Sequence, residues 1–129
     1  MSSILISIKP EFAEKIFNGT KKYEFRKRGC RRPIQKLIIY ATFPVMKIVG
    51  EAKVKGVIDD SPEEVWGITK SHAGISADYY YSYFDGKDKA VAYCLEGACL
   101  YDKPKELSVF GVSPVSYTHL DVYKRQPIE

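Results

Sequence analysis

The sequence predicts an α+β domain, a small β-barrel of five to six strands with two to three short helices. Three observations predict this class. Five or more β-rich segments alternate with turn signals along the chain. Gly50 and Gly56 interrupt the longest of these segments, and glycines inside strands indicate the bulges that let a sheet curl. Short stretches with helix caps lie between the strands, as expected for helices placed over the mouth of a barrel.

The first half of the chain is predicted to hold a strand, a helix and three more strands. Pro10 is favoured at the first position of a helix, and Gly19 is favoured just after its end. The apolar pattern then changes to a period of two, which places Glu24 and Arg26 on the same side of a strand. The expected segments are residues 4–8 (strand), 10–17 (helix), 21–28 (strand), 35–42 (strand) and 48–58 (strand).

The second half is predicted to begin with two helices. Ser61 and Glu64 form a capping box with Pro62 at the first helical position. Ser76 can cap a second helix that carries several tyrosines. These tyrosines and Trp66 either offer stacking surfaces for a base or lie in the core. The expected segments are residues 62–70 (helix), 77–84 (helix), 89–96 (strand), 99–102 (strand) and 107–111 (a short final element).

Length and composition limit the class of protein. The 129 residues are 45% hydrophobic, which fits one globular domain. No apolar run approaches the roughly 20 residues that span a bilayer, and no secretory signal follows Met1. We therefore expect a cytoplasmic protein without membrane contact. The three cysteines form no CxxC pair and no even set, which predicts free thiols, no metal site and no cofactor.

The segment VSYTHLDVYKRQ, residues 115–126, has no cap, turn signal or hydrophobic period that continues the domain. Its back-translation, preceded by the CT of a Pro114 codon, is a perfect inverted repeat. This repeat resembles two mosaic ends of a sequencing transposon joined tail to tail; the alternative is a natural amphipathic strand. We expect the folded domain to span residues 1–114 and residues 115–129 to be a non-native read-through tail.

Positive charge is concentrated in one part of the sequence. Residues 9–36 hold ten Lys and Arg against three Glu, a net charge of +7, although the whole chain has a net charge of +4. Such a concentration favours contacts with phosphate groups, and the alternative is a solvated face that only maintains solubility. The predicted basic patch comprises Lys22, Lys27, Arg28, Arg31 and Arg32.

Residues 19–26 spell GxKxxExR between the first helix and the second strand. This motif follows the sequence Ser-Ile-Lys-Pro of residues 7–10 and a helix, and in that order it resembles the signature of the ASCH domains. The resemblance covers about residues 4–113, including Tyr-Ala-Thr at 40–42 and Phe-Gly at 110–111. It implies a PUA-like β-barrel with a cleft that is lined by the motif and takes RNA, nucleotides or modified nucleobases.

The motif residues suit such a cleft on physical grounds. Glu24 and Arg26 share a strand face, so each compensates the burial of the other, and Glu24 can accept a hydrogen bond from an exocyclic amine. Lys21 supplies a cation for a phosphate or a carbonyl oxygen. The alternative is an ion pair that only orders the barrel wall. The predicted ligand-binding residues are Ser7, Lys9, Lys21, Glu24, Arg26, Tyr40 and Thr42.

We expect a module that binds RNA or a nucleotide in this cleft and acts in the regulation of transcription or RNA metabolism. The alternative is a hydrolase that acts on RNA or on modified nucleosides. One branch of the family hydrolyses the amide of acetylated cytidine with a lysine and a threonine of the motif and a glutamate elsewhere. Here Glu24 occupies the position of the hydroxyl nucleophile and Thr20 precedes Lys21, so Lys21 and Glu24 are the candidate catalytic pair.

A third hypothesis is regulation of transcription through protein contacts. Such a partner would be captured even in the presence of nuclease and high salt, which weaken contacts to nucleic acid. Protein partners, the identity of the ligand and the oligomeric state stay open at this point.

Overall fold

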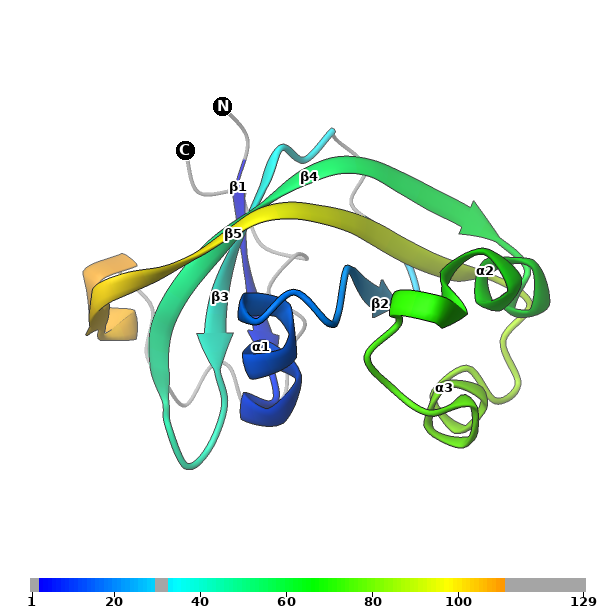
Figure 1. Cartoon of the computed structure of the whole chain (residues 1–129), viewed down its shortest axis with the longest axis horizontal. Helices are drawn as coiled ribbons and strands as arrows, with labels where there is room; N and C mark the ends of the chain where they lie inside the picture. The colour runs from blue at the N-terminus through cyan, green and yellow to red at the C-terminus, as the bar shows by residue number, and fades with distance from the viewer. Residues whose placement is uncertain (1–2, 30–32, 111–129) are drawn as a thin grey trace.

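The computed structural model describes residues 3–29 and 33–110 as a curled sheet with helices beside it (Figure 1). The expected tail at 115–129, Cys30, and Arg31 and Arg32 of the predicted basic patch lie outside the described residues. None of the helices in the described ranges has the length and apolar character needed to cross a membrane.

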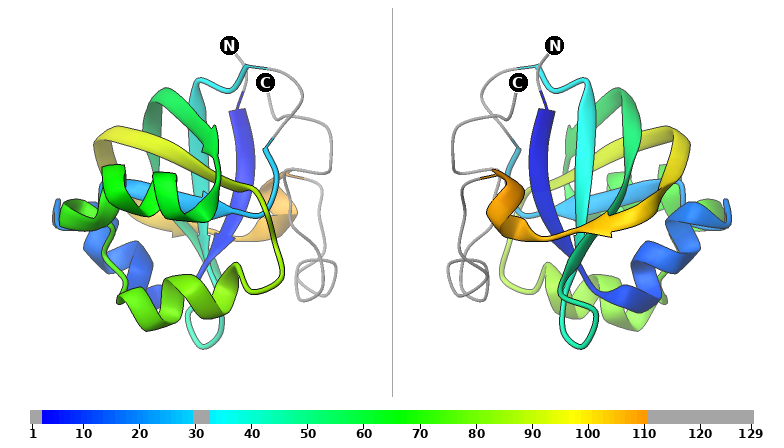
Figure 2. Two further views of the ribbon diagram at one scale, coloured as in Figure 1. Left: turned by 90° about the vertical axis from the view of Figure 1, so that its right-hand side faces the viewer. Right: turned by 90° about the vertical axis from the view of Figure 1, so that its left-hand side faces the viewer.

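Five strands form one mixed sheet in the order β1-β3-β4-β5-β2. β1 pairs with β3 in parallel, and the remaining neighbours are antiparallel. The sheet is strongly curled in the two side views (Figure 2), and the Arg26 side chain of edge strand β2 reaches the Ser7 carbonyl of edge strand β1. The strands are β1 (Ser3–Ile8), β2 (Tyr23–Arg26), β3 (Lys36–Ala41), β4 (Lys47–Asp60) and β5 (Ala90–Lys105).

Three α-helices and two short 3₁₀ segments complete the fold, which confirms the α+β class and its short helices. The hydroxyl of Ser61 accepts a hydrogen bond from the backbone N–H of Glu64 at 3.2 Å, so the predicted cap of α2 is present. Ser76 caps α3 in the same way, accepting from the N–H of Tyr79 at 3.1 Å. The helical segments are α1 (Pro10–Phe17), α2 (Pro62–Thr69), η1 (Lys70–His72), α3 (Ala77–Tyr83) and η2 (Leu107–Phe110).

Bulges between β4 and β5 account for much of the curl. The register shifts between Val54 and Gly56 and again between Ile48 and Gly50, as the two glycines in this strand suggested. A Cβ atom on Gly50 would collide with the Cys99 carbonyl oxygen and would come within 2.7 Å of the Phe17 ring, so this glycine allows α1 to pack closely on the sheet.

The prediction of two strands at 89–96 and 99–102 is wrong, because β5 runs without a break from Ala90 to Lys105. Gly97, with a positive φ of 59°, lies where the pairing with β4 shifts between Glu51 and Lys53. A glycine in this conformation forms a bulge inside a strand rather than a turn between two strands. The short final element is the 3₁₀ segment η2, not a strand.

The apolar core has two parts. The larger part lies between the sheet and α1. The smaller part gathers Phe25 of β2 with residues of α2 and α3, where the Phe25 and Tyr80 rings meet edge to face at a centroid separation of 5.2 Å. Tyr80 also donates a hydrogen bond to the Pro62 carbonyl at 2.8 Å, and its ring packs against Trp66 at 4.6 Å. This second core fixes α3 beside β2.

Candidate functional site

A pocket of about 160 Å³ lies where the end of β1, the start of α1, β2 and α3 meet. Its floor is polar, and its walls are formed by aromatic and apolar side chains. The residues that line it are Ser7, Ile8, Lys9, Phe12, Lys21, Glu24, Phe25, Arg26, Ile75, Tyr79 and Tyr83.

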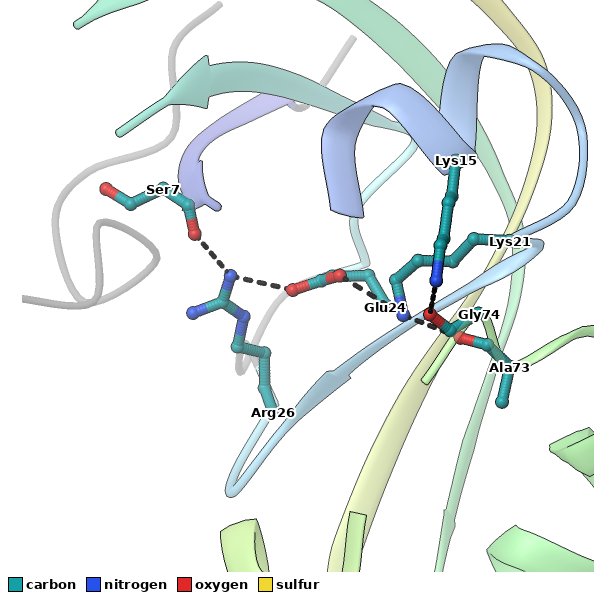
Figure 3. A network of polar contacts seen from close by, with 7 residues as sticks. All are labelled: Ser7, Lys15, Lys21, Glu24, Arg26, Ala73 and Gly74. Atoms are coloured by element: carbon teal, nitrogen blue, oxygen red, sulfur yellow. Dashed lines mark hydrogen bonds and ion pairs between the residues drawn. The ribbon is translucent and has the colours of Figure 1, made fainter. Parts of the chain in front are cut away.

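A chain of polar contacts forms the floor of the pocket (Figure 3). Arg26 donates from Nη2 to the Ser7 carbonyl oxygen at 2.7 Å and to Oε2 of Glu24 at 2.8 Å. Oε1 of Glu24 lies 3.9 Å from Nζ of Lys21. Because Ser7 belongs to β1 and Arg26 to β2, this chain connects the two edge strands of the curled sheet.

Lys21 is the most deeply buried member of the chain, with only 2% of its surface exposed. Its Nζ donates to the Ala73 carbonyl oxygen at 2.7 Å and lies 4.9 Å from the centroid of the Phe25 ring. Burial lowers the pKa of Lys21 from its ordinary value, and the carboxylate of Glu24 opposes this shift. The site therefore holds a lysine that gives up a proton more readily than one in water.

Residues 72–74, which lead from η1 toward α3, are fastened to α1 and the motif by three hydrogen bonds. Lys21 donates to the Ala73 carbonyl, Lys15 donates to the Gly74 carbonyl at 3.2 Å, and the N–H of Lys22 donates to the His72 carbonyl at 2.8 Å. The side chain of Lys21 passes directly over Gly74, where a Cβ atom would lie 2.5 Å from the Lys21 Cβ. Gly74 has a positive φ of 72°, which a glycine adopts without strain.

Two tyrosines of α3 form one wall of the pocket, and the Nζ atom of a lysine lies over the ring of each. Tyr79 packs edge to face on Phe12 with the centroids 5.2 Å apart, and Nζ of Lys9 lies 5.3 Å from the Tyr79 centroid. Nζ of Lys27 lies 4.7 Å from the centroid of Tyr83. The wall thus combines aromatic faces with positive charge.

The structure brings together five of the seven predicted ligand-binding residues, namely Ser7, Lys9, Lys21, Glu24 and Arg26. Tyr40 and Thr42 do not line this pocket. Tyr40 is 3% exposed and belongs to the larger core, and the N–H of Thr42 bonds to the Ile8 carbonyl at 3.0 Å where the β3–β4 hairpin begins. In the predicted basic patch, Lys22 directly before β2 and Arg28 shortly after it are both exposed, and Nζ of Lys27 lies over the Tyr83 ring.

The predicted set of ligand-binding residues omits four residues of the pocket wall, which come from α1, α3 and the segment before α3. For the tyrosines of α3 the sequence leaves stacking surface and core open, and the structure places Tyr79 and Tyr83 in the pocket wall. Phe12 and Ile75 carry no such signal, because a core uses the same side chains. In the structure Tyr79 is 38% exposed, whereas Tyr80 beside it is buried in the second core. Gly74, just before α3, also gave no signal.

The pocket offers both donors and an acceptor to a small planar ligand. The carboxylate of Glu24 accepts from amines, and the cations of Lys21 and Arg26 donate to carbonyl oxygens. The side-chain oxygen of Ser7 is buried and has no hydrogen-bond partner among the described residues. Within residues 3–29 and 33–110, no group of three or more His, Cys, Asp or Glu side chains lies close enough together to hold a metal ion.

The curled mixed sheet and the ion chain at its joined edges define a small α+β domain with a polar pocket. The family model described as "ASCH domain" matches residues 6–114, and the chain belongs to the ASCH domain family. The predicted family resemblance is therefore confirmed.

Curated relatives are similar in sequence to this chain over most of its length. An ASCH domain-containing ribonuclease from Zymomonas mobilis is 36% identical over 92 residues, which cover 70% of this chain and 62% of that protein. The ATP synthase subunit alpha of Ureaplasma parvum is 32% identical over 121 residues, which cover 92% of this chain and 15% of that protein. The chain thus spans less than two thirds of the length of these curated relatives.

Solved structures share the fold. The crystal structure of ASCH from Zymomonas mobilis superposes with a TM-score of 0.75 at 32% identity, covering 83% of this chain and 75% of that one. The N-terminal domain of McrB from Staphylothermus marinus gives a TM-score of 0.52 at 15% identity, covering 90% of this chain and 82% of that one, a likeness of fold alone.

Proposed function

We propose that this chain binds single-stranded RNA or a nucleotide, and that a base occupies the pocket above the GxKxxExR motif. The observation that carries this proposal is the ion chain of Lys21, Glu24 and Arg26 beneath a wall of aromatic rings. A domain of this size gains little stability from three buried charges, because apolar residues of similar volume stabilise a core at least as well. We therefore attribute the three buried charges to recognition of a polar ligand.

The chemistry of the pocket matches that of a nucleobase. The face of a base stacks on aromatic rings such as Tyr79, and its edge presents amines and carbonyl oxygens. An exocyclic amine fits the carboxylate of Glu24, and a carbonyl oxygen beside it fits the Lys21 or Arg26 cation. The net charge of +7 over residues 9–36 supports contacts with the phosphates of the strand.

The family supports RNA over other polymers. One relative, 36% identical, is an ASCH domain-containing ribonuclease. Regulation of transcription or of RNA metabolism is then the process in which we expect the domain to act, through the RNA that it binds. This cellular role is part of the proposal.

Two tyrosines of the same helix provide a matched test. Tyr79 lines the pocket and is 38% exposed, whereas Tyr81 is 41% exposed but packs beside Trp66 outside the pocket. We expect Tyr79→Leu to weaken the binding of a short random-sequence RNA by about 1–3 kcal/mol, the contribution of one stacked base. Tyr81→Leu should leave the affinity unchanged. Equal affinities for the two variants, measured by fluorescence anisotropy, would contradict the proposal.

A second candidate function is cleavage of RNA, which is favoured by the lowered pKa of Lys21 beside a carboxylate. Glu24 would take the proton from a ribose 2′-hydroxyl, whose oxygen attacks the adjacent phosphorus. The bond to the 5′-oxygen then breaks, and Lys21 gives that oxygen a proton. The products are a 2′,3′-cyclic phosphate and a 5′-hydroxyl end.

RNA is a better substrate candidate than acetylated cytidine. The hydroxyl of Thr20 bonds to Asn18 at 2.7 Å and does not line the pocket, so the threonine of the motif is not available as a nucleophile. Cleavage is tested by incubating RNA with the wild-type protein and with Glu24→Asp, which keeps the charge but withdraws the carboxylate. We expect cyclic phosphate products from the wild type alone. Intact RNA in both reactions would leave the domain as a binding module.

A further inference from the structure

Two exposed lysines flank the pocket, and each rests on a tyrosine of α3. Lys9, which precedes α1, lies over Tyr79, and Lys27, which follows β2, lies over Tyr83. The two tyrosines are four residues apart and therefore share one face of the helix, separated by one turn of about 6 Å along its axis. The helix thus places two cations about one turn apart along the pocket wall.

These lysines differ from the other cations of the site. Lys21 and Arg26 are buried and contact Glu24, and Lys15 is bonded to a backbone carbonyl. Among the described residues, neither Lys9 nor Lys27 forms an ion pair or a side-chain hydrogen bond, and the Nζ atom of each lies over a tyrosine ring. An exposed lysine that lies over a tyrosine ring is weakly held, so it can turn to a stronger anion without breaking an ion pair.

The size of the pocket limits what enters it. A volume of about 160 Å³ is well below the roughly 300 Å³ at which pockets begin to hold drug-sized ligands, so a single base fits and the chain that carries it does not. With a base in the pocket, the sugar and the phosphates of a bound strand lie at its mouth, an arrangement for binding and not for cleavage by Glu24 and Lys21. Lys9 lines the pocket and Lys27 lies over Tyr83 of the pocket wall, and both lysines are exposed.

We propose that the pocket takes one base from within a strand, and that Lys9 and Lys27 hold the phosphates on its two sides. This inference rests on the proposed function, because it needs the base in the pocket. It adds that the ligand unit is a nucleotide with phosphate at both its 3′ and 5′ oxygens, not a free nucleoside or a strand terminus. The spacing of Tyr79 and Tyr83 on α3 sets the distance between the two lysines, and so between the two phosphates that they bind.

Small nucleotides test the inference directly. The four nucleoside 3′,5′-bisphosphates are compared with the 3′-monophosphates, the 5′-monophosphates and the free nucleosides by isothermal titration calorimetry. For the base that the pocket accepts, we expect the bisphosphate to bind about three- to ten-fold more tightly than either monophosphate. Lys9→Gln should remove the gain from one of the two phosphates, and Lys27→Gln should remove the gain from the other.

The control is Lys103→Gln, which removes an exposed positive charge at the far end of β5 from α3 (Figure 1). With a short random-sequence single-stranded RNA, the slope of log affinity against log salt should fall by about 0.7 for Lys9→Gln and again for Lys27→Gln. The double variant should show both losses. Lys103→Gln should leave the slope unchanged.

Two results would overturn the inference while sparing the proposed function. One is that Lys9→Gln and Lys27→Gln affect binding no more than Lys103→Gln does, although Tyr79→Leu still weakens RNA binding. The other is a bisphosphate that binds no better than its monophosphates. Failure of every nucleotide and of RNA to bind the wild-type protein would overturn both proposals.

Discussion

Glu24 lies between two cations, and its neighbours explain why it tolerates burial. Oε2 accepts from Arg26 at 2.8 Å, and Oε1 lies 3.9 Å from Lys21. Arg26 is in turn fixed by the Ser7 carbonyl and Lys21 by the Ala73 carbonyl. Each charge in this chain has a partner, so removing one member leaves another uncompensated in a place with little water.

Replacing the carboxylate should therefore destabilise the fold. We expect Glu24→Gln to lower the free energy of unfolding by about 3 kcal/mol, because Arg26 and Lys21 then lose their anion. Adding Arg26→Met should restore part of the loss, with a coupling of about 1–3 kcal/mol. Urea denaturation of the two single variants and the double variant measures this. Strictly additive losses would show that the two side chains do not act as a pair.

The titration of Lys21 should appear in the pH dependence of stability. Burial lowers the pKa of this lysine in the folded state, so the unfolded state binds more protons between the lowered pKa and 10.5. Stability conferred by this residue should therefore rise with pH across that window. The wild type should gain free energy of unfolding relative to Lys21→Met as the pH approaches 10.5. Parallel pH profiles for the two proteins would contradict this pKa shift.

At the scale of elements, the position of α3 depends on the short segment before it. Residues 72–74 receive hydrogen bonds from Lys15, Lys21 and the backbone of Lys22, all of which belong to α1 or the motif. α3 follows this segment and carries the tyrosines of the pocket wall. The motif thus contributes charges to the floor and also sets where the wall stands.

Variants at Gly74 and Gly86 distinguish the positioning role of the segment before α3 from the effect of backbone strain alone. Gly74 and Gly86 both have positive φ, 72° and 76°, but a Cβ atom at Gly86 would meet nothing within 4 Å whereas one at Gly74 would collide with Lys21. Each change to alanine should cost about 1–2 kcal/mol of stability from backbone strain, and Gly74→Ala more. Only Gly74→Ala should also weaken RNA binding. Thermal melts measure the stability of both variants, and fluorescence anisotropy measures their affinity for RNA. Equal RNA affinities for the two variants would contradict the positioning role.

The elements differ in how far the sequence predicts them. Caps and proline positions predicted α2 and α3, since these signals act within a few residues. The continuity of β5 through Gly97 depends on pairing with β4, which no local pattern records. The same limit applies to the pocket. The charged residues of its floor lie within one motif, but Tyr79 and Tyr83 reach the pocket only through the second core around Tyr80.

For the whole molecule, the curl of the sheet is the feature that creates the site. β1 and β2 are the two edges of the sheet order, and Arg26 joins them through the Ser7 carbonyl. The positive charge over residues 9–36 follows the same region of the chain, because α1, the motif and β2 all belong to it. The curl and part of this charge therefore meet at the pocket, which Lys9, Lys21 and Arg26 line.

NMR of the ¹⁵N-labelled protein during titration with short single-stranded RNA tests this account most directly. We expect the largest chemical-shift changes at Ser7, at Lys21 to Arg26 and at Ile75 to Tyr83, together with a shift of the Arg26 side-chain Nε resonance. The β3–β4 hairpin at residues 42–46 and the far end of β5 should remain unchanged. Changes confined to those two regions, with the pocket resonances unmoved, would contradict the claim that the pocket is the RNA site.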